Sequence, residues 1–404
     1  MSNAKYLLVG SLVLWFFGSL VTTAPQAQTV DPVKSQVMAE LSRASTNDFV
    51  PNEILIKFKP YIVESAFYDE ADELLTTTGV PYQNKQKLFA KTFAEASELY
   101  NIYKIEALAG TDIKRAVTKL NNRMDVAYAE PNYKAYAFFT PNDPSFSQQY
   151  GLQRIQAPQA WDIHQGDSTT VAAVVDTGIN SSHADLSNKV VNGSYDCGIY
   201  HGTHCAGIIA ADTNNGVGIA GVGFKVNLAG YNALDCSGSG SLGTIAQEIN
   251  NATSGGAKVI NLSLGGPSGS STLKNAIDNA VNSGVVVVAS AGNCGEGCPS
   301  SNCQSVNQVN YPAAYDNVIA VAATDSSDQR ACFSNKNDYV DVTAPGVSIY
   351  STLGSSYGNM SGTSMSGPHV AGLAALLYSL PQYSARNTAN AQAIRQIIET
   401  TTDD

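Results

Sequence analysis

The stretch TVAAVVD, residues 170–176, decides the fold class of this chain. Five apolar residues stand between Thr170 and Asp176, with no polar residue among them. A strand with one face in water alternates apolar and polar side chains, whereas a strand that is buried on both faces is apolar throughout. The stretch therefore predicts an inner strand of a parallel sheet that helices cover on both faces.

Three later stretches share this pattern, KVINLSL (258–264), GVVVVAS (284–290) and NVIAVAA (317–323), and segments with helical spacing separate them. This alternation predicts a three-layer α/β/α domain around a mostly parallel sheet. The turn-forming stretch FFTPNDPSFSQQ (138–149) precedes it, so we expect the domain to span residues 140–404.

A smaller α+β domain is predicted over residues 50–137. Strands are expected at EILIKFK (53–59), YNIYKIE (100–106) and MDVAYAEPNYKAYA (124–137), and helices at 64–79 and 111–122, the second with Thr111 as its N-cap. The order strand, helix, strand, helix, strand indicates a split β-α-β, ferredoxin-like fold.

The first 28 residues are typical of a secretory signal peptide. The apolar run YLLVGSLVLWFFGSLV (6–21) follows Lys5 and leads into small and polar residues. An uncleaved membrane anchor is the alternative, because the run is long for a signal core. We expect a secreted monomer that has no membrane contact once the signal is removed.

Charge and cysteine content limit the partners. The formal net charge is −11, and no cluster of Lys or Arg occurs, which argues against nucleic acid and anionic membranes. The chain has seven cysteines, none of them in the first 196 residues. In an oxidising compartment an odd count indicates three disulfides and one free thiol, with the pairing left open.

Three motifs place reactive side chains at the ends of predicted elements. Asp176 ends the strand of VVDTGI, and His201 begins the helix of HGTHCAGIIAA. Ser364, in SGTSMSGPHVAGLAALLYSL (361–380), lies at the start of an apolar helix, where backbone N–H groups favour developing negative charge. Acyl transfer needs these three residue types, because an imidazole must take the serine proton and a carboxylate must orient the imidazole.

Two other classes of function are compatible with parts of this pattern. His201, His204 and Cys205 are residue types that bind zinc, so a zinc-dependent hydrolase is one alternative. A catalytically inactive binding or scaffold protein is the other, although it requires a lost catalytic residue and none is missing.

Longer stretches carry a family resemblance. PNDPSFSQQYGLQRIQAPQAWDI (141–163), VINLSLGGPSGS (259–270), SAGN (290–293) and SGTSM (361–365) make region 140–404 similar to the subtilases, the subtilisin-like serine proteases, and within them to the thermitase and proteinase K groups. The resemblance implies a secreted serine endopeptidase that cleaves protein substrates through an acyl-enzyme. It assigns Asp176 as the orienting carboxylate, His201 as the base and acid, Ser364 as the nucleophile, and Asn293 as an oxyanion donor.

The same resemblance implies the remaining sites. Two backbone segments should pair with an extended peptide, Gly238, Ser239 and Gly240 on one side and Ser263, Leu264 and Gly265 on the other, with residues 289–293 closing the primary pocket. A structural calcium ion should be held by the side chains of Asp143, Asp185 and Asn215 and the carbonyls of Asp212, Val217 and Ile219. The first domain resembles the inhibitory prodomain, with self-cleavage near Phe138–Thr140. Cys197 and Cys236 match a disulfide of proteinase K relatives, and Cys205 matches a buried free thiol.

The chain also departs from these relatives. Tyr200 replaces the usual glycine before the catalytic histidine, and the stretch before it lacks the acidic loop of a second calcium site. CGEGCPSSNCQSVNQ (294–308) is an insertion directly after Asn293. We expect its three cysteines and Cys332 to form two disulfides of open connectivity, and the rim that they stiffen to shape the primary pocket.

Overall fold

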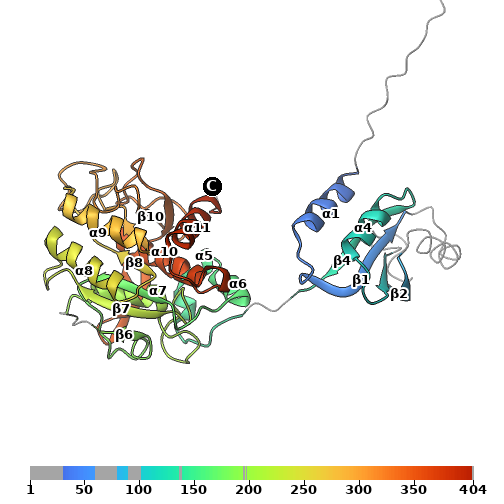
Figure 1. The fold of residues 1–404 in the computed structure, drawn as a ribbon, viewed down its shortest axis with the longest axis horizontal. Coiled ribbons are helices and arrows are strands. Elements are labelled where there is room, and N and C mark those ends of the chain that lie inside the picture. Colours follow the sequence, from blue (N-terminus) through green and yellow to red (C-terminus); the bar gives the residue numbers. More distant parts are fainter. Residues whose placement is uncertain are drawn as a thin grey trace, which may run out of the picture. The chain divides into compact units, whose positions relative to one another are not determined.

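The computed structural model describes residues 31–59, 80–89, 102–135, 139–193, 196 and 198–402. The expected signal peptide and the helix expected at 64–79 lie outside the described residues. The chain divides into two compact units, Met1–Tyr136 and Ala137–Asp404, and each is described by itself (Figure 1). Within the described residues, no helix is both long and apolar enough to cross a membrane.

The first unit is an antiparallel sheet with helices packed against it. Its strands follow the order β2-β3-β1-β4. Its elements are α1 (Pro32–Arg43), β1 (Phe49–Phe58), β2 (Tyr82–Lys87), β3 (Ile102–Ala107), α4 (Ile113–Asn121) and β4 (Val126–Tyr133). The core forms where alternate residues of β1, such as Ile54 and Ile56, meet Leu120 of α4.

Three details of this unit differ from the sequence-based expectations. The side chain of Asp112 caps α4 by accepting from the N–H of Arg115, whereas Thr111 donates its hydroxyl to the Leu108 carbonyl, so Thr111 is not the N-cap. Helix α1 was not expected, nor was β2, whose sequence YQNKQK lacks apolar alternation. β2 is an edge strand that its pairing with β3 holds, which a single-strand pattern does not reveal.

The second unit has the expected three-layer α/β/α architecture. Its seven-stranded sheet is parallel throughout, in the order β11-β10-β9-β8-β5-β7-β6. The strands are β5 (Val171–Asp176), β6 (Val190–Asn192), β7 (Asn227–Asn232), β8 (Val259–Leu262), β9 (Val286–Ser290), β10 (Ile319–Thr324) and β11 (Val342–Pro345), and β12 (Ile349–Leu353) pairs with β13 (Ser356–Met360) in a separate hairpin.

Helices cover both faces of this sheet (Figure 1). Ala172 and Val174 of β5 face the layer of α7, α10 and α11, whereas Ala173 and Val175 face the layer of α8 and α9. The helices are α5 (Tyr150–Arg154), α6 (Ala157–Ile163), α7 (His201–Ala210), α8 (Leu242–Ser254), α9 (Ser271–Asn282), α10 (Thr363–Tyr378) and α11 (Thr388–Thr400), and two 3₁₀ turns cover Phe146–Gln148 and Pro381–Tyr383. Burial on both faces explains why these strands are mostly apolar, although Asn261 of β8 is polar and fully buried.

The strand order places a reversal beside β5. The chain runs from β5 to β6 and β7 on one side, and then returns to β8 on the other side of β5. In open parallel sheets, ligands bind outside the carboxyl ends of the strands at such a reversal. The segments that follow β5, β8 and β9 are therefore where a site is expected.

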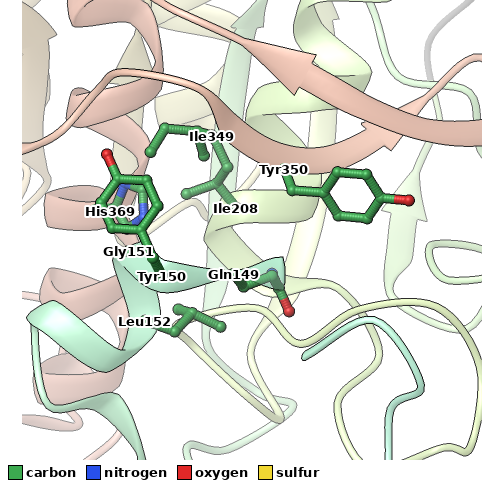
Figure 2. Close-up of a pocket in the computed structure, with 8 residues that line it drawn as sticks. All are labelled: Gln149, Tyr150, Gly151, Leu152, Ile208, Ile349, Tyr350 and His369. Carbon is green, nitrogen blue, oxygen red and sulfur yellow. The ribbon is translucent and has the colours of Figure 1, made fainter. Parts of the chain in front are cut away.

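A small cavity lies elsewhere, where α5, α7, β12 and α10 meet (Figure 2). Its volume is about 10 Å³, which is enough for a single water molecule and too small for a substrate. Figure 2 shows its lining, which is Gln149, Tyr150, Gly151, Leu152, Ile208, Ile349, Tyr350 and His369. The ring of His369 is buried and donates from Nδ1 to the Met365 carbonyl, 2.8 Å away.

Candidate active site

Asp176 and His201 form a hydrogen-bonded pair at the end of β5. The Asp176 side chain is fully buried, and its Oδ1 accepts from His201 Nδ1 at 2.8 Å and from the Thr177 N–H at 2.7 Å. A neutral imidazole that donates from Nδ1 carries its free lone pair on Nε2. With 25% of its side chain exposed, His201 can offer that lone pair to a molecule in the cleft.

Electrostatics favour the charged form of His201. Burial of the ring by itself lowers the pKa, but the adjacent Asp176 carboxylate outweighs burial and raises the pKa of His201 above its ordinary value of 6.5. The pair therefore stabilises an imidazolium once His201 has accepted a proton.

Tyr200 places His201 at the first position of α7. Its φ of +57° lies in the left-handed region that glycine favours, which is why a glycine is usual there. The Tyr200 ring packs on Gly354, where an added Cβ would come within 3.1 Å of ring atoms. The tyrosine is therefore accommodated because residue 354 has no side chain.

Ser364 is the second residue of α10, and its carbonyl connects three segments. Pro368, four residues on, has no N–H to donate to that carbonyl. The Ser364 carbonyl instead accepts from Ser263 Oγ at 2.8 Å and from Cys205 Sγ at 3.4 Å. The Ser364 hydroxyl itself donates to the Ser263 carbonyl at 3.2 Å.

Cys205 joins the pair to Ser364. The side-chain ligand atoms of Asp176, His201 and Cys205, one from each residue, lie within 4.8 Å of one another. The Cys205 Sγ also contacts the Ser364 carbonyl. Cys205 is a buried free thiol, as expected, and burial raises its pKa well above the ordinary value. A protonated thiol is a poor zinc ligand.

The zinc site expected as an alternative from His201, His204 and Cys205 is not assembled. The Nε2 of His204 donates to the Gly358 carbonyl at 3.1 Å, and the ring is fully buried. Although residues three apart on a helix lie on the same broad face, the His204 ring contacts the β12–β13 hairpin while the His201 ring contacts Asp176.

Asn293 and Ser364 place two donors beside Gly362. Asn293 Oδ1 accepts from the Thr363 N–H at 2.9 Å and from the Thr363 hydroxyl at 3.0 Å, which leaves Nδ2 free to donate elsewhere. A Cβ built on Gly362 would lie 3.5 Å from Asn293 Nδ2 and 3.6 Å from the Ser364 nitrogen. Both donors therefore border one small space that no side chain at residue 362 fills.

A cleft of about 630 Å³ adjoins this group. It contains every residue expected to flank an extended peptide, together with His201 and residues that the sequence analysis missed. Its lining is Thr177, Ile199, His201, Leu234, Gly238, Ser239, Gly240, Leu242, Ile245, Ser263, Leu264, Gly265, Gly266, Leu273, Asn302, Tyr311, Pro312 and Met360.

One wall of the cleft differs from the wall expected for the primary pocket. Residues 289–293 were expected to close the primary pocket opposite residues 263–265, but they are absent from the lining, which instead includes Asn302, Tyr311 and Pro312. The bridge between Gly266 and Tyr311 brings this wall to the cleft. The insertion containing Asn302 was the available signal in the sequence, whereas nothing local marked Tyr311.

The structure resolves the pairing of the four cysteines in and beyond the insertion. Cys294 pairs with Cys303 and Cys298 pairs with Cys332, so the insertion holds the two bridges expected there. Among the described residues Cys236 is an exposed free thiol, and its expected partner Cys197 lies outside them.

The residues expected to hold calcium meet around the loop of residues 212–219, which follows α7. Asp143 and Asp185 are 4% and 0% exposed, and burial raises the pKa of both carboxyl groups. Asp143 accepts from the Asn214 and Asn215 N–H groups, and Asp185 accepts from Asn215 Nδ2 and from the Ile219 N–H. Among the described residues, neither carboxylate forms an ion pair with a basic side chain.

The other residues expected to bind calcium belong to the loop of residues 212–219. The N–H of Asp212 donates to the Asp185 carbonyl at 2.9 Å, and Asn215 Oδ1 accepts from the Val217 N–H at 2.7 Å. The Asn215 amide thus presents its nitrogen, not its oxygen, to Asp185. Tyr357, which no sequence pattern marked, donates a hydrogen bond from its hydroxyl to Asp185.

A parallel α/β sheet with a buried Asp–His pair, a serine at a helix N-terminus and two adjacent donors defines the class of serine hydrolases. The Subtilase family model matches residues 166–404, and the model of the Fervidolysin N-terminal prodomain matches residues 35–132. The chain belongs to the subtilase family and is a serine protease with an N-terminal prodomain.

Individual proteins of similar sequence support this family assignment. The chain is 40% identical to Thermophilic serine proteinase of Bacillus sp. (strain AK1) over 411 residues, 99% of this chain and 94% of that protein. It is 50% identical to Thermitase of Thermoactinomyces vulgaris over 275 residues, 66% of this chain and 92% of that protein. Among solved structures, a protease from Pseudoalteromonas arctica PAMC 21717 matches with a TM-score of 0.58 and 32% identity, covering 66% of this chain and 93% of that one.

Two buried histidines predict a loss of stability in acid. Burial lowers the pKa of His204 and of His369 to about 4, from 6.5 when exposed. Because the unfolded chain binds the proton first, the stabilising contribution is complete above pH 6.5 and is lost as the pH falls towards 4, by up to about 3 kcal/mol for each ring.

We therefore expect His369→Asn, which keeps a donor near the Met365 carbonyl, to flatten the fall in unfolding free energy between pH 6.5 and 4. His204→Gln, which keeps a donor towards Gly358, is the matched variant. Urea unfolding of protein treated with a serine-directed inhibitor, over a pH series, measures this. An unchanged slope in both variants would contradict it.

Proposed function

We propose that this protein is a secreted serine endopeptidase, made as a self-processing zymogen, that cleaves protein chains through Asp176, His201 and Ser364. The observation that carries the proposal is the buried Asp176 carboxylate bonded to His201 in the wall of the cleft. The cleft is long enough to be lined by two separate backbone segments, which fits an extended peptide.

Each residue has a chemical role in this proposal. His201 Nε2 takes the proton of the Ser364 hydroxyl as its Oγ attacks the peptide carbonyl, and then gives that proton to the leaving amine. Water hydrolyses the resulting acyl-enzyme by the same exchange of protons. Asp176 holds Nδ1–H and stabilises the imidazolium. The Ser364 hydroxyl must first leave the Ser263 carbonyl that it contacts in this structure.

Asn293 Nδ2 and the Ser364 N–H would bind the oxyanion. Both donors border the space beside Gly362, and Thr363 fixes the orientation of the amide. A donor of this kind lowers the barrier by about 3 kcal/mol because it is already oriented before charge develops.

Substrate pairing would use the backbone of residues 238–240 and 263–265. Gly265 approaches the Asn310 side chain so closely that an added Cβ would lie 2.2 Å from its Nδ2, so no side chain at this position can obstruct the cleft. Main-chain pairing reads few side chains, which favours broad specificity.

Calcium fits the residues around Asp143 and Asp185. Two buried carboxylates without a basic partner among the described residues are costly unless a cation or protons neutralise them. Oxygen donors suit a hard cation. The carboxylates of Asp143 and Asp185, the Asn215 amide oxygen after it turns over, and the carbonyls of Asp212, Val217 and Ile219 would hold it. The ion would supply stability and take no part in catalysis.

Self-processing predicts that Ser364→Ala accumulates as the unprocessed chain that lacks only its signal peptide. The reason is that the same serine would cleave the connection near Phe138–Thr140, of which Phe138 lies outside the described residues. Mass spectrometry of the secreted protein measures the product. Ser366→Ala, two residues along the same helix, is the control and should mature normally. Maturation of Ser364→Ala at the parental rate would refute the role of Ser364.

Calcium removal predicts a lower melting temperature. An ion at 100 times its Kd stabilises the folded state by about 2.7 kcal/mol, so EDTA should lower Tm by several degrees. Asp185→Asn should abolish this response. Asp341→Asn, which alters a carboxylate bonded to the Ala320 N–H elsewhere in the domain, should keep it. Equal melting of the parent with and without EDTA would count against the site.

Because Asn302 of the insertion lines the cleft, we expect its substitution to change the enzyme's preference among substrate side chains. Asn302→Leu replaces a polar group in the cleft wall with an apolar one and should raise kcat/KM for aromatic over polar side chains before the cut by about tenfold. Peptide libraries with mass spectrometry measure this ratio. Ser301→Ala, one residue away and outside the lining, should not change it, and an equal ratio in Asn302→Leu would exclude the role.

A further inference from the structure

The insertion contacts the main chain of Asn293 as well as the cleft. The Asn293 carbonyl accepts from the Ser300 N–H at 2.8 Å, and Cys303 Sγ lies 3.5 Å from the same oxygen. The next residue, Cys294, donates its N–H to Asn335 Oδ1 at 2.7 Å. Residues 294–308, which we call the disulfide loop, thus hold Asn293 from its main-chain side.

Both bridges restrain the residue that makes this contact. Ser300 lies between Cys298 and Cys303 in the sequence. Cys294–Cys303 closes a loop with a sequence separation of 9, and Cys298–Cys332 ties that loop to the segment after β10. The Gly297 N–H also donates to the Cys332 carbonyl at 3.0 Å. The Ser300 N–H is therefore anchored from two directions.

The two ends of Asn293 are held by different parts of the chain. Thr363 of α10 binds the side-chain oxygen, and Ser300 of the disulfide loop binds the main-chain oxygen. An oxyanion donor is effective only if it is oriented before the reaction, and a displacement of about 1 Å can cost up to about 10²-fold in rate. Freeing the main-chain end would let the amide turn away from the space beside Gly362.

We propose that the disulfide loop is a positioning element for the oxyanion donor: the Ser300 N–H and the Cys294–Cys303 bridge orient Asn293, so the oxidation state of this bridge sets kcat. The proposal rests on the role given to Asn293 under Proposed function. Reduction by a dithiol consumes two electrons and two protons, breaks the S–S bond, yields two thiols, and converts the dithiol to its own disulfide.

The proposal makes kcat, rather than KM, the sensitive quantity. The donors act on charge that develops in the transition state, whereas ground-state binding depends on the cleft. Removing the bridge with Cys294→Ser/Cys303→Ser should lower kcat about tenfold or more and leave KM within about twofold. A merely stabilising bridge would lower Tm and leave kcat per active site unchanged.

A double-mutant cycle with Asn293→Ala tests the coupling. The cycle measures kcat and KM of the mature enzyme, normalised by active-site titration, for the parent, Asn293→Ala, Cys294→Ser/Cys303→Ser and the triple variant. We expect the loss of the bridge to lower kcat in the parent and to have no further effect once Asn293 is alanine. Additive losses, or no loss in the parent, would overturn the proposal.

A second pair of variants covers the case in which the cysteine variant does not fold. Ser300→Pro removes the N–H that binds the Asn293 carbonyl, and Ser301→Pro removes a neighbouring N–H that has no partner among the described residues. We expect only Ser300→Pro to lower kcat. Dithiothreitol treatment of the mature parent should reproduce the loss, and equal kcat in both proline variants would overturn the proposal.

The cycle separates this proposal from the proposed function. If Asn293→Ala does not itself lower kcat by about 10²- to 10³-fold, the oxyanion role of Asn293 fails and the positioning proposal fails with it. If Asn293→Ala is that severe and the loop variants match the parent, the proposed function stands and the positioning proposal alone is rejected.

Discussion

The site depends on a hydrogen bond that α10 cannot make. Pro368 has no N–H, so the Ser364 carbonyl is left without its helical donor and accepts from Ser263 and Cys205 instead. This one carbonyl thereby joins α10 to the segment after β8 and to α7. A proline inside a helix ordinarily weakens it. Here the released acceptor holds the serine against α7, which carries His201, and against the segment after β8, which lines the cleft.

Burial decides how the acidic groups behave. Asp176 is fully buried beside His201, and the contact raises the histidine pKa. Asp143 and Asp185 are equally removed from water but face a loop of backbone N–H groups and each other, and burial raises the pKa of both carboxyls. Under the proposed function, the same residue type would therefore orient a histidine in one place and bind a cation in the other, because the neighbouring groups differ.

The disulfide loop contacts both the main chain of Asn293 and the wall of the cleft. Its contacts with Asn293 are to the main chain, and Asn302 enters the cleft wall from the same loop. Two bridges within a short segment offset the entropy that such an irregular loop would otherwise lose on ordering. Under the two proposals above, changes in this loop would affect catalysis through Asn293 and specificity through Asn302.

The sequence by itself determined the α/β class, the buried strands and the family, because apolar runs and the motifs around Asp176, His201 and Ser364 are local patterns. The family resemblance also placed the six backbone residues of the cleft, of which Ser263, Leu264 and Gly265 follow directly after β8. Contacts between distant segments were decided only by the tertiary structure: the pairing of the four cysteines, Tyr311 in the cleft wall, the free state of Cys236, and the bond from Ser300 to Asn293. The physical reason is that periodicity records how a residue is buried, whereas a contact between segments depends on chain packing that no single stretch encodes.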